Sequence, residues 1–418
     1  MTLVSPMDES LSAQIEFLVR RESARLISVL TRILGPQNLE LAEDVLQESF
    51  MSAMEVWSTQ GIPDNPPGWL LTTARNRAID AIRRERTRAT FAPDLALFLE
   101  GEWTLTRAVD HAFEEDWARD DQLRMIFMCC HPRLAPENRL PLILKTMCGL
   151  SVPAIARALL TTESTINKRL YRTRRALKGV EFLLPSPEEL PGALETVHTV
   201  LYLLFNEGSF STTEVPILRE MCRDAISLTQ LLVDEPQMSN GNTVALLALM
   251  CFAAARFDSR VDESGQPIPL DEQNRTLWDQ ALIRRGLGLL NRSSQRAAGL
   301  ASRYHLEAAI AARHCGAKTF GATDWHSICN LYDRLLEVYP SPLTRLNRAV
   351  AISYRGAPED AIPIVEQLRG TDQLPHSNVV AAVLANLYAR AGDGETASRF
   401  REVALAQANS PHERRMIR

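Results

Sequence analysis

Two clusters of basic side chains are the residues of this sequence whose types and spacing most clearly indicate a chemical role. Residues 71–90 contain six arginines against two acidic residues, and residues 163–178 contain six basic residues against one acidic residue. Between them, residues 91–121 contain nine acidic residues against two arginines. Guanidinium groups bind phosphate oxygens through charge and paired hydrogen bonds. The pattern therefore predicts two DNA contacts on separate modules, although the net charge of −5 argues against a simple nucleic-acid coat protein.

The first basic segment, WLLTTARNRAIDAIRRERTR over residues 69–88, is expected to form a helix. Its predicted buried stripe consists of small and apolar residues at helical spacing: Leu71, Ala74, Ala78 and Ile82. The arginines fall outside this stripe, so they are available for phosphate groups: Arg75, Arg77, Arg83, Arg84 and Arg86.

The preceding segment, LELAEDVLQESFMSAMEVW over residues 39–57, predicts an amphipathic helix with apolar or small residues at 42, 45, 46, 49, 50, 53 and 57. Its opposite face holds Glu43 with Gln47, and Asp44 with Glu48. These are two i,i+4 pairs without a cation to neutralise them. Such a face is either solvated or a docking surface for a basic partner.

The second basic segment, SVPAIARALLTTESTINKRLYRTRRALK, has the pattern of a helix-turn-helix. Ile155 and Ala156 fit its first helix, and Ile166 and Leu170 fit the buried stripe of the second. Thr162 is expected to cap the second helix. The outward residues, polar at the N-terminal end and basic beyond it, are predicted to face DNA: Ser164, Thr165, Asn167, Lys168, Arg169, Arg172 and Arg175.

Nearly every segment of the 418 residues has helical period, which predicts an all-α protein. Proline- and glycine-rich segments and the change in charge suggest the boundaries. The expected parts are a helical module at 10–90, an acidic linker at 91–120, a helix-turn-helix module at 121–180 and a C-terminal domain at 190–418.

The C-terminal domain contains signs of helix-pair repeats. Gly356 and Gly392 are 36 residues apart, and each ends an alanine-rich helix before a second helix. Pro340 and Pro375 follow the second helices at a spacing of 35. This layout resembles tetratricopeptide (TPR) repeats, and a generic helical bundle is the alternative.

Several classes of protein find no support in the sequence. We find no apolar run near the roughly 18–20 residues that span a membrane, and no secretory signal, so a cytoplasmic location is expected. The seven cysteines are irregularly spaced, which fits reduced thiols. Cys129-Cys130-His131 is the only cluster with metal-ligand character, and we expect neither a metal nor a cofactor. No nucleophile elbow, P-loop or dinucleotide motif is present, so we expect no enzyme activity.

Together these motifs resemble an extracytoplasmic-function (ECF) sigma factor of the sigma-70 family. LAEDVLQESF and WLLTTARNRAIDAIRR are similar to the family's region 2, and the helix-turn-helix is similar to region 4, although Leu160 stands where the turn usually has glycine. FMCCHPRLAPENR, VLYLLFNEGS and LDEQNRTLWDQALI look like the subtype with a long TPR-like C-terminal extension.

The resemblance implies a set of partners and contacts. Core RNA polymerase would be bound at its flap and at the basic coiled coil of its clamp, the latter by Glu43, Asp44, Gln47 and Glu48. The −10 element of promoter DNA would be bound by Trp69, Arg75, Asn76, Arg77, Arg83 and Arg84. The −35 element would be bound by Ser164, Thr165, Asn167, Lys168, Arg169, Arg172 and Arg175. The extension would regulate the factor from within, with a protein or ligand as its own partner left open. A helix-turn-helix activator with a TPR-like sensor domain is the alternative.

Overall fold

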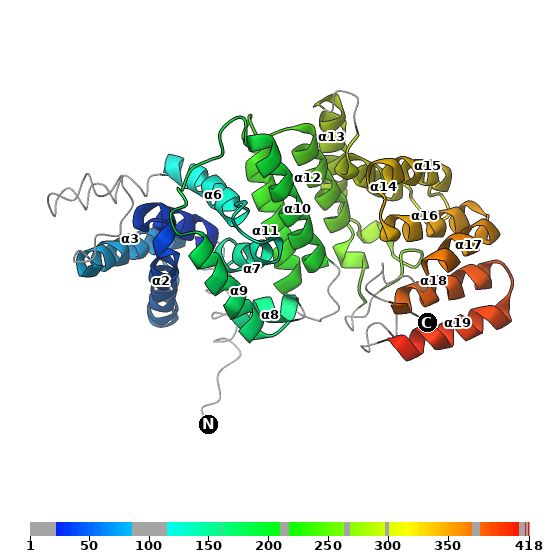
Figure 1. Ribbon diagram of the computed structural model, residues 1–418, viewed down its shortest axis with the longest axis horizontal. Helices are drawn as coiled ribbons and strands as arrows, with labels where there is room; N and C mark the ends of the chain where they lie inside the picture. Colours follow the sequence, from blue (N-terminus) through cyan, green and yellow to red (C-terminus); the bar gives the residue numbers. More distant parts are fainter. Residues whose placement is uncertain are drawn as a thin grey trace. The chain divides into compact units, whose positions relative to one another are not determined.

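The computed structural model describes most of the chain as helices (Figure 1). The described residues are 22–85, 115–159, 161–209, 217–262, 268–296, 301–369 and 377–408, with Arg414 and Ile417. No strand occurs in these ranges, and the expectation of an all-α protein is confirmed. The acidic linker predicted at 91–120 lies largely outside them. Contacts divide the chain into two compact units, one of residues 1–208 with 223–231 and one of residues 209–222 with 232–418.

The first unit begins with a helix over residues 22–34, and a 3-10 turn (Pro36–Asn38) leads into α2 (Leu39–Gln60). The buried residues of α2 follow the predicted stripe: Leu39, Ala42, Val45, Leu46, Ser49, Ala53 and Trp57. The helix ends at Gly61, whose φ of 84° lies in the left-handed region that glycine adopts without strain.

The next helix, α3 (Pro66–Glu85), begins three residues before the predicted start at Trp69. The fixed φ of proline suits a first helical position, and the Asn65 side-chain oxygen accepts a hydrogen bond from the Gly68 N–H at 3.0 Å. Leu70, rather than the predicted Leu71, belongs to the buried stripe. Leu70 lies four residues before Ala74 and so continues the i,i+4 row that faces the core.

The rest of the first unit is a run of helices: α6 (Glu115–Cys129), α7 (Pro136–Thr146), α8 (Val152–Ala158), α9 (Glu163–Ala176) and most of α10 (Leu190–Ser209). α7 packs on both α8 and α9, so it supports the helix-turn-helix. Most of α10 belongs to the same compact unit as the helices before it, although the proline-rich segment at 183–192 separates them in sequence.

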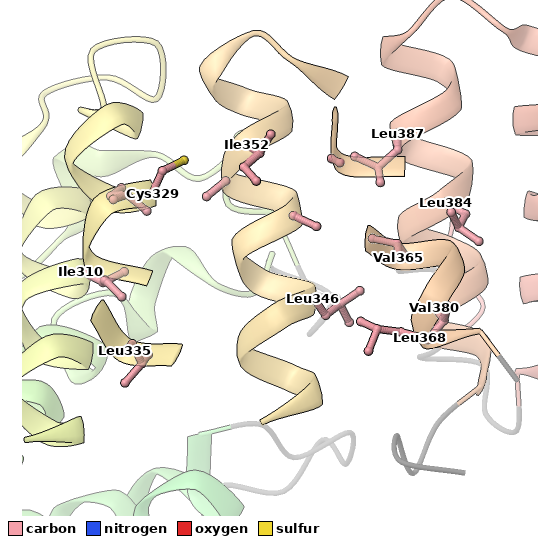
Figure 2. Close-up of a cluster of buried hydrophobic side chains, with 14 of the residues drawn as sticks. Ile310, Cys329, Leu335, Leu346, Ile352, Val365, Leu368, Val380, Leu384 and Leu387 are labelled. Atoms are coloured by element: carbon pink, nitrogen blue, oxygen red, sulfur yellow. The ribbon is translucent and has the colours of Figure 1, made fainter. Parts of the chain in front are cut away.

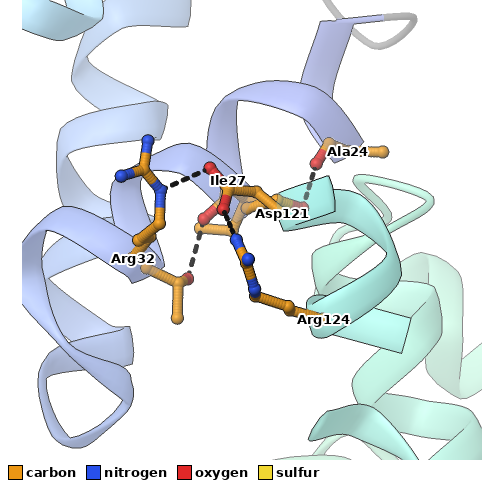
Figure 3. Close-up of polar contacts among 7 residues, drawn as sticks. Ala24, Ile27, Arg32, Asp121 and Arg124 are labelled. Atoms are coloured by element: carbon orange, nitrogen blue, oxygen red, sulfur yellow. Dashed lines mark hydrogen bonds and ion pairs between the residues drawn. The ribbon is translucent and has the colours of Figure 1, made fainter. Parts of the chain in front are cut away.

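A buried carboxylate joins the helix at 22–34 to α6 (Figure 3). Asp121 is fully buried, and its two oxygens accept hydrogen bonds from Arg32 Nε at 2.7 Å and from Arg124 Nη1 at 2.9 Å. Nearby, Ser28 Oγ lies 3.9 Å from Met147 Sδ. A carboxylate without water needs such partners, so these contacts fix the first module against the second.

The second unit starts with helices around an apolar core. α11 (Ile217–Asp234) is shared between the two units, and α12 (Gly241–Ala254) packs against α13 (Gln280–Arg296) and α14 (Arg303–Gly316). One stretch, Gly241–Ser259, is long and apolar enough to cross a membrane by length and composition, contrary to the expectation from sequence. Most of it is buried inside the protein, as in the core helix of a soluble domain.

Helix pairs complete the second unit: α15 (Trp325–Val338), α16 (Pro342–Arg355), α17 (Pro358–Leu368), α18 (Ser377–Arg390) and α19 (Gly394–Gln407). Gly356 and Gly392 have φ of 106° and 87° and end α16 and α18, at the predicted turns. Figure 2 shows that α15, α16, α17 and α18 share one apolar core, which includes Ile352, Val365 and Leu384. Pro375 lies outside the described residues.

Candidate polymerase and promoter interface

One face of α2 carries the side chains predicted to dock on polymerase. Asp44, Gln47 and Glu48 are exposed, whereas Glu43 is half-buried. Burial, followed by the nearby Glu40 carboxylate, raises the pKa of Asp44, while Arg174 acts in the opposite direction. The helix thus concentrates negative charge, because Leu39–Gln60 contains five acidic residues and neither lysine nor arginine.

Cations from other helices neutralise part of this face, which corrects the expectation that it is uncompensated. Arg174 Nη2 in α9 donates to Glu43 Oε2 at 2.6 Å, and Arg77 Nη1 in α3 donates to Glu48 Oε2 at 2.6 Å. These partners lie 131 and 29 residues away in sequence, so the spacing within one helix could not reveal them.

Two exposed methionines lie on α2 beyond the residues predicted to dock on polymerase. Met51 is 63% exposed and Met54 is 37% exposed, and Met51 lies one turn beyond Gln47. Neither methionine falls on the buried stripe of α2. Their positions outside the apolar periodicity of the sequence could have identified them as exposed residues. A flexible thioether adapts readily to the surface of a partner.

The residues predicted to meet the −10 element lie along α3. Asn76 is exposed, and Trp69 is half-buried with its ring 5.4 Å from the Trp57 ring in an edge-to-face arrangement. Trp69 and Asn76 are seven residues apart, which places them on one face of the helix. Arg75 is half-buried and Arg77 also donates to Ser52 Oγ. Arg83 and Arg84 lie in α3, but their side chains are outside the described residues.

The second module has the local geometry of a helix-turn-helix. The Ser151 side chain caps α8, and the Thr162 side chain accepts from the Thr165 N–H at 3.2 Å, so the predicted cap of α9 is confirmed. Ile166 and Leu170 are buried, as predicted. Leu160 lies outside the described residues. The predicted DNA-facing residues are exposed or half-buried: Ser164, Thr165, Asn167, Lys168, Arg169, Arg172 and Arg175.

The second module is strongly basic. Residues 124–180 contain eleven lysines and arginines against Glu137 and Glu163. Arg172 and Arg175 are exposed one turn apart on α9. This surface can hold phosphate groups, whereas the acidic α2 would repel them.

The Cys129-Cys130-His131 cluster has the surroundings of a packed core. Both thiols are buried, and burial raises the pKa of Cys129 to about 12. Cys129 Sγ also lies 3.4 Å from Thr146 Oγ1. Metal binding requires the thiolate, which burial disfavours. Within the described ranges, no group of three His, Cys, Asp or Glu residues could hold a metal ion.

Comparison with known families defines the class of protein. Residues 18–88 match the model for sigma-70 region 2, and residues 124–177 match the model for sigma-70 region 4. Residues 193–294 match a family of unknown function, DUF6596. The chain therefore carries both sigma-70 regions, which imply binding of RNA polymerase and recognition of promoters in the manner of a sigma factor.

The chain is also similar to individual proteins. An uncharacterized protein of Rhizobium meliloti is 36% identical over 343 residues, which cover 79% of this chain and 78% of that protein. The chain belongs to the same family as that protein. A Mycobacterium tuberculosis protein named probable ECF RNA polymerase sigma factor SigI is 27% identical over 158 residues, 38% of this chain and 52% of that protein. No solved structure gives a significant match.

Proposed function

We propose that this protein is an ECF-type sigma factor that binds core RNA polymerase through α2 and directs transcription from promoters with −10 and −35 elements. The observation that carries the proposal is the combination, in one compact unit, of an acidic helix with two basic helices inside the region 2 and region 4 matches. Such a factor needs no catalytic chemistry of its own, and it works in the cytoplasm, where polymerase is.

The contacts follow from the chemistry of each surface. The exposed carboxylates of α2 would bind a basic coiled coil of the polymerase clamp, with Met51 adding apolar contact. Asn76 and Trp69 would meet bases of the −10 element, since an amide can read an unpaired base edge and an indole can stack on it. The N-terminal part of α9 would read the −35 element in the major groove, while region 4 also contacts the polymerase flap.

The C-terminal extension would regulate this activity from within the same chain. Its support is that α10, which belongs to the DUF6596 match, also belongs to the compact unit of the sigma regions. The helix pairs from α16 to α19 would form a TPR-like array, whose concave face suits a helix or an extended peptide. We expect the extension to be required for transcription.

The test of the proposed function is docking by purified full-length protein on core polymerase. Asp44→Arg should abolish holoenzyme formation, because it places a cation opposite a basic partner. It is a cleaner change than Asp44→Arg with Glu48→Arg, since Glu48 also holds Arg77. Glu188→Arg, an exposed charge reversal outside the three helices of the site, is the matched control and should bind as the wild type does.

Transcription reactions on genomic fragments would then separate the two candidate functions. A sigma factor directs initiation by core polymerase alone, whereas a helix-turn-helix activator requires polymerase that already holds another sigma factor. Transcription seen only in the second case would contradict the proposal.

A further inference from the structure

Two arginines of the second unit lie against one buried tryptophan. Arg256 stands just beyond the end of α12, and Arg275 and Trp278 belong to the segment LDEQNRTLWDQALI. The Cζ atoms of Arg256 and Arg275 lie 5.3 Å and 4.7 Å from the centroid of the Trp278 ring. Trp278 Nε1 donates a hydrogen bond to Ser259 Oγ at 2.7 Å, so the ring has a fixed position between its neighbours.

The hydrogen-bond partners of these two arginines are neutral. Arg256 Nε and Nη2 donate to Gln273 Oε1 at 3.3 Å and 3.1 Å. Arg275 Nη1 donates to the carbonyl oxygens of His314 and Ala317, each at 2.8 Å, at the end of α14. Within the described ranges, no carboxylate pairs with either arginine. Charges that are withdrawn from water are ordinarily paired in proteins, so this cluster lacks an anion.

The electrostatics of the cluster agree with that deficit. Burial lowers the pKa of Arg256 to about 10, and repulsion from Arg260 and Arg275 contributes to the shift. Burial, followed by the charges of Arg256 and Arg275, lowers the pKa of His314 to about 4. The Trp278 ring attracts both guanidiniums but carries no net charge, so it offsets the repulsion only in part.

Several nitrogen atoms of the cluster remain without a partner. Arg275 Nε and His314 Nδ1 are buried and form no hydrogen bond. Arg256 Nη1 forms none to any residue that the structure describes, and it is not among the buried atoms. Arg256 therefore presents an unused donor group to an incoming acceptor.

We propose that the second unit binds a small oxyanion, the carboxylate or phosphate group of a small molecule, at Arg256 and Arg275. The planar N–H groups of a guanidinium match the oxygen atoms of either group. Both arginines are half-buried, which suits a small ion better than the backbone of DNA. The site concerns the extension alone and does not depend on the proposed role in transcription.

A bound anion would have a mechanical consequence. Arg256 follows α12, and Arg275 holds the carbonyl groups at the end of α14. An anion that contacts both guanidiniums therefore links the ends of these two helices and stabilises the segment between them.

The test follows hydrogen exchange of the full chain on peptides from residues 250–262 and 270–283. Sodium phosphate and sodium acetate are titrated separately against sodium chloride of the same ionic strength. Gln273→Glu places a carboxylate at the position from which Gln273 Oε1 now accepts from Arg256, and it keeps both cations. Arg256→Gln removes one cation. Gln367→Glu, an exposed residue of α17, is the matched control for the added charge.

In the wild type, phosphate or acetate should raise protection of these peptides, by about tenfold at ten times the dissociation constant. Gln367→Glu should respond as the wild type does, whereas Gln273→Glu and Arg256→Gln should lose most of the response. General stabilisation by the salts would affect all variants alike, so the difference between variants reports the site. A response to phosphate alone assigns a phosphate group, and a response to acetate alone assigns a carboxylate.

Two results would overturn the site: no response of the wild type to either anion, or an equal response in the wild type and in Gln273→Glu. Gln273→Glu also loses the hydrogen bond from Gln273 Nε2 to the Ile268 carbonyl oxygen, so the change on adding anion is compared rather than protection itself. If Arg256→Gln fails to fold, Gln273→Glu still decides. Polymerase is absent from the experiment, so its outcome is separate from that of the proposed function.

Discussion

Two glycines of α13 allow the packing of the second unit to be tested with an internal control. A Cβ added at Gly286 would lie 2.8 Å from Cε1 and 2.9 Å from Cζ of Phe252, closer than real Cβ contacts come. A Cβ added at Gly288 would meet nothing within 4 Å. Both positions are inside the same helix, so alanine gives each of them about the same gain in helix propensity, roughly 1 kcal/mol.

The difference between the two variants therefore isolates the clash. Phe252 is fully buried and among the largest such side chains, so its ring has nowhere to move. Overpacking of this kind costs about 1–3 kcal/mol. We expect Gly288→Ala to stabilise the second unit by up to about 1 kcal/mol, and Gly286→Ala to be about 1–3 kcal/mol less stable than Gly288→Ala.

Hydrogen exchange of the full chain, followed on peptides from α12 and α13, measures this difference locally. A gap of 1–3 kcal/mol corresponds to about a 5- to 150-fold difference in protection between the two variants. Equal protection would show that α12 and α13 are not packed as described, and greater protection in Gly286→Ala would refute the reasoning outright.

The same pair of variants tests the role of the C-terminal extension without truncation. A cut after Gly179 would remove α10 together with the rest of the extension, and because α10 belongs to the first compact unit, the cut would also damage the unit that holds the sigma regions. If the extension is required, Gly286→Ala should lower transcription from target promoters at temperatures where Gly288→Ala does not. Equal transcription despite different stability would argue against that requirement.

The remaining predictions concern promoter reading and pH. Asn76→Ala and Asn167→Ala should each weaken the free energy of promoter binding by about 1–3 kcal/mol and relax the base preference at one position. Arg172→Ala should instead weaken binding to all promoter variants alike. Uniform effects for both asparagines would show that these two residues do not read bases. Burial lowers the pKa of His198 to about 4, so the folded state disfavours its protonation. Stability should therefore fall by about 1.4 kcal/mol per unit as pH drops from about 6.5 toward about 4, and His198→Phe should reduce that slope in urea unfolding; an unchanged slope would exclude His198 as its source.

The sequence was a good guide wherever local chemistry determines structure. The buried stripe of α2 and the Thr162 cap of α9 depend on residues within a few positions of each other, and both were predicted. The buried stripe of α3 was predicted one residue off at its start. Leu70 and Leu71 are adjacent and equally apolar, so only the rotation of the helix relative to the core determines which of the two is buried.

Contacts between distant segments could not be predicted in this way. The pairing of Glu43 with Arg174 joins residues 131 positions apart, and Asp121 meets Arg32 across 89 positions. The charge pattern of the sequence indicates that the acidic residues need cationic partners. It does not identify those partners, because several arginines satisfy the same electrostatic requirement. Packing of the modules makes that choice.

The proposed TPR-like arrangement of the helix pairs has a consequence for the evolution of the gene. α16 begins at Pro342 and α18 at Ser377, so these two pairs start 35 residues apart. Because each pair in such an array contacts mainly its neighbours, an in-frame gain or loss of roughly 105 base pairs adds or removes one whole pair. Chains with the same promoter-binding helices should therefore differ in length in steps of one pair, with the steps concentrated toward the C-terminal end.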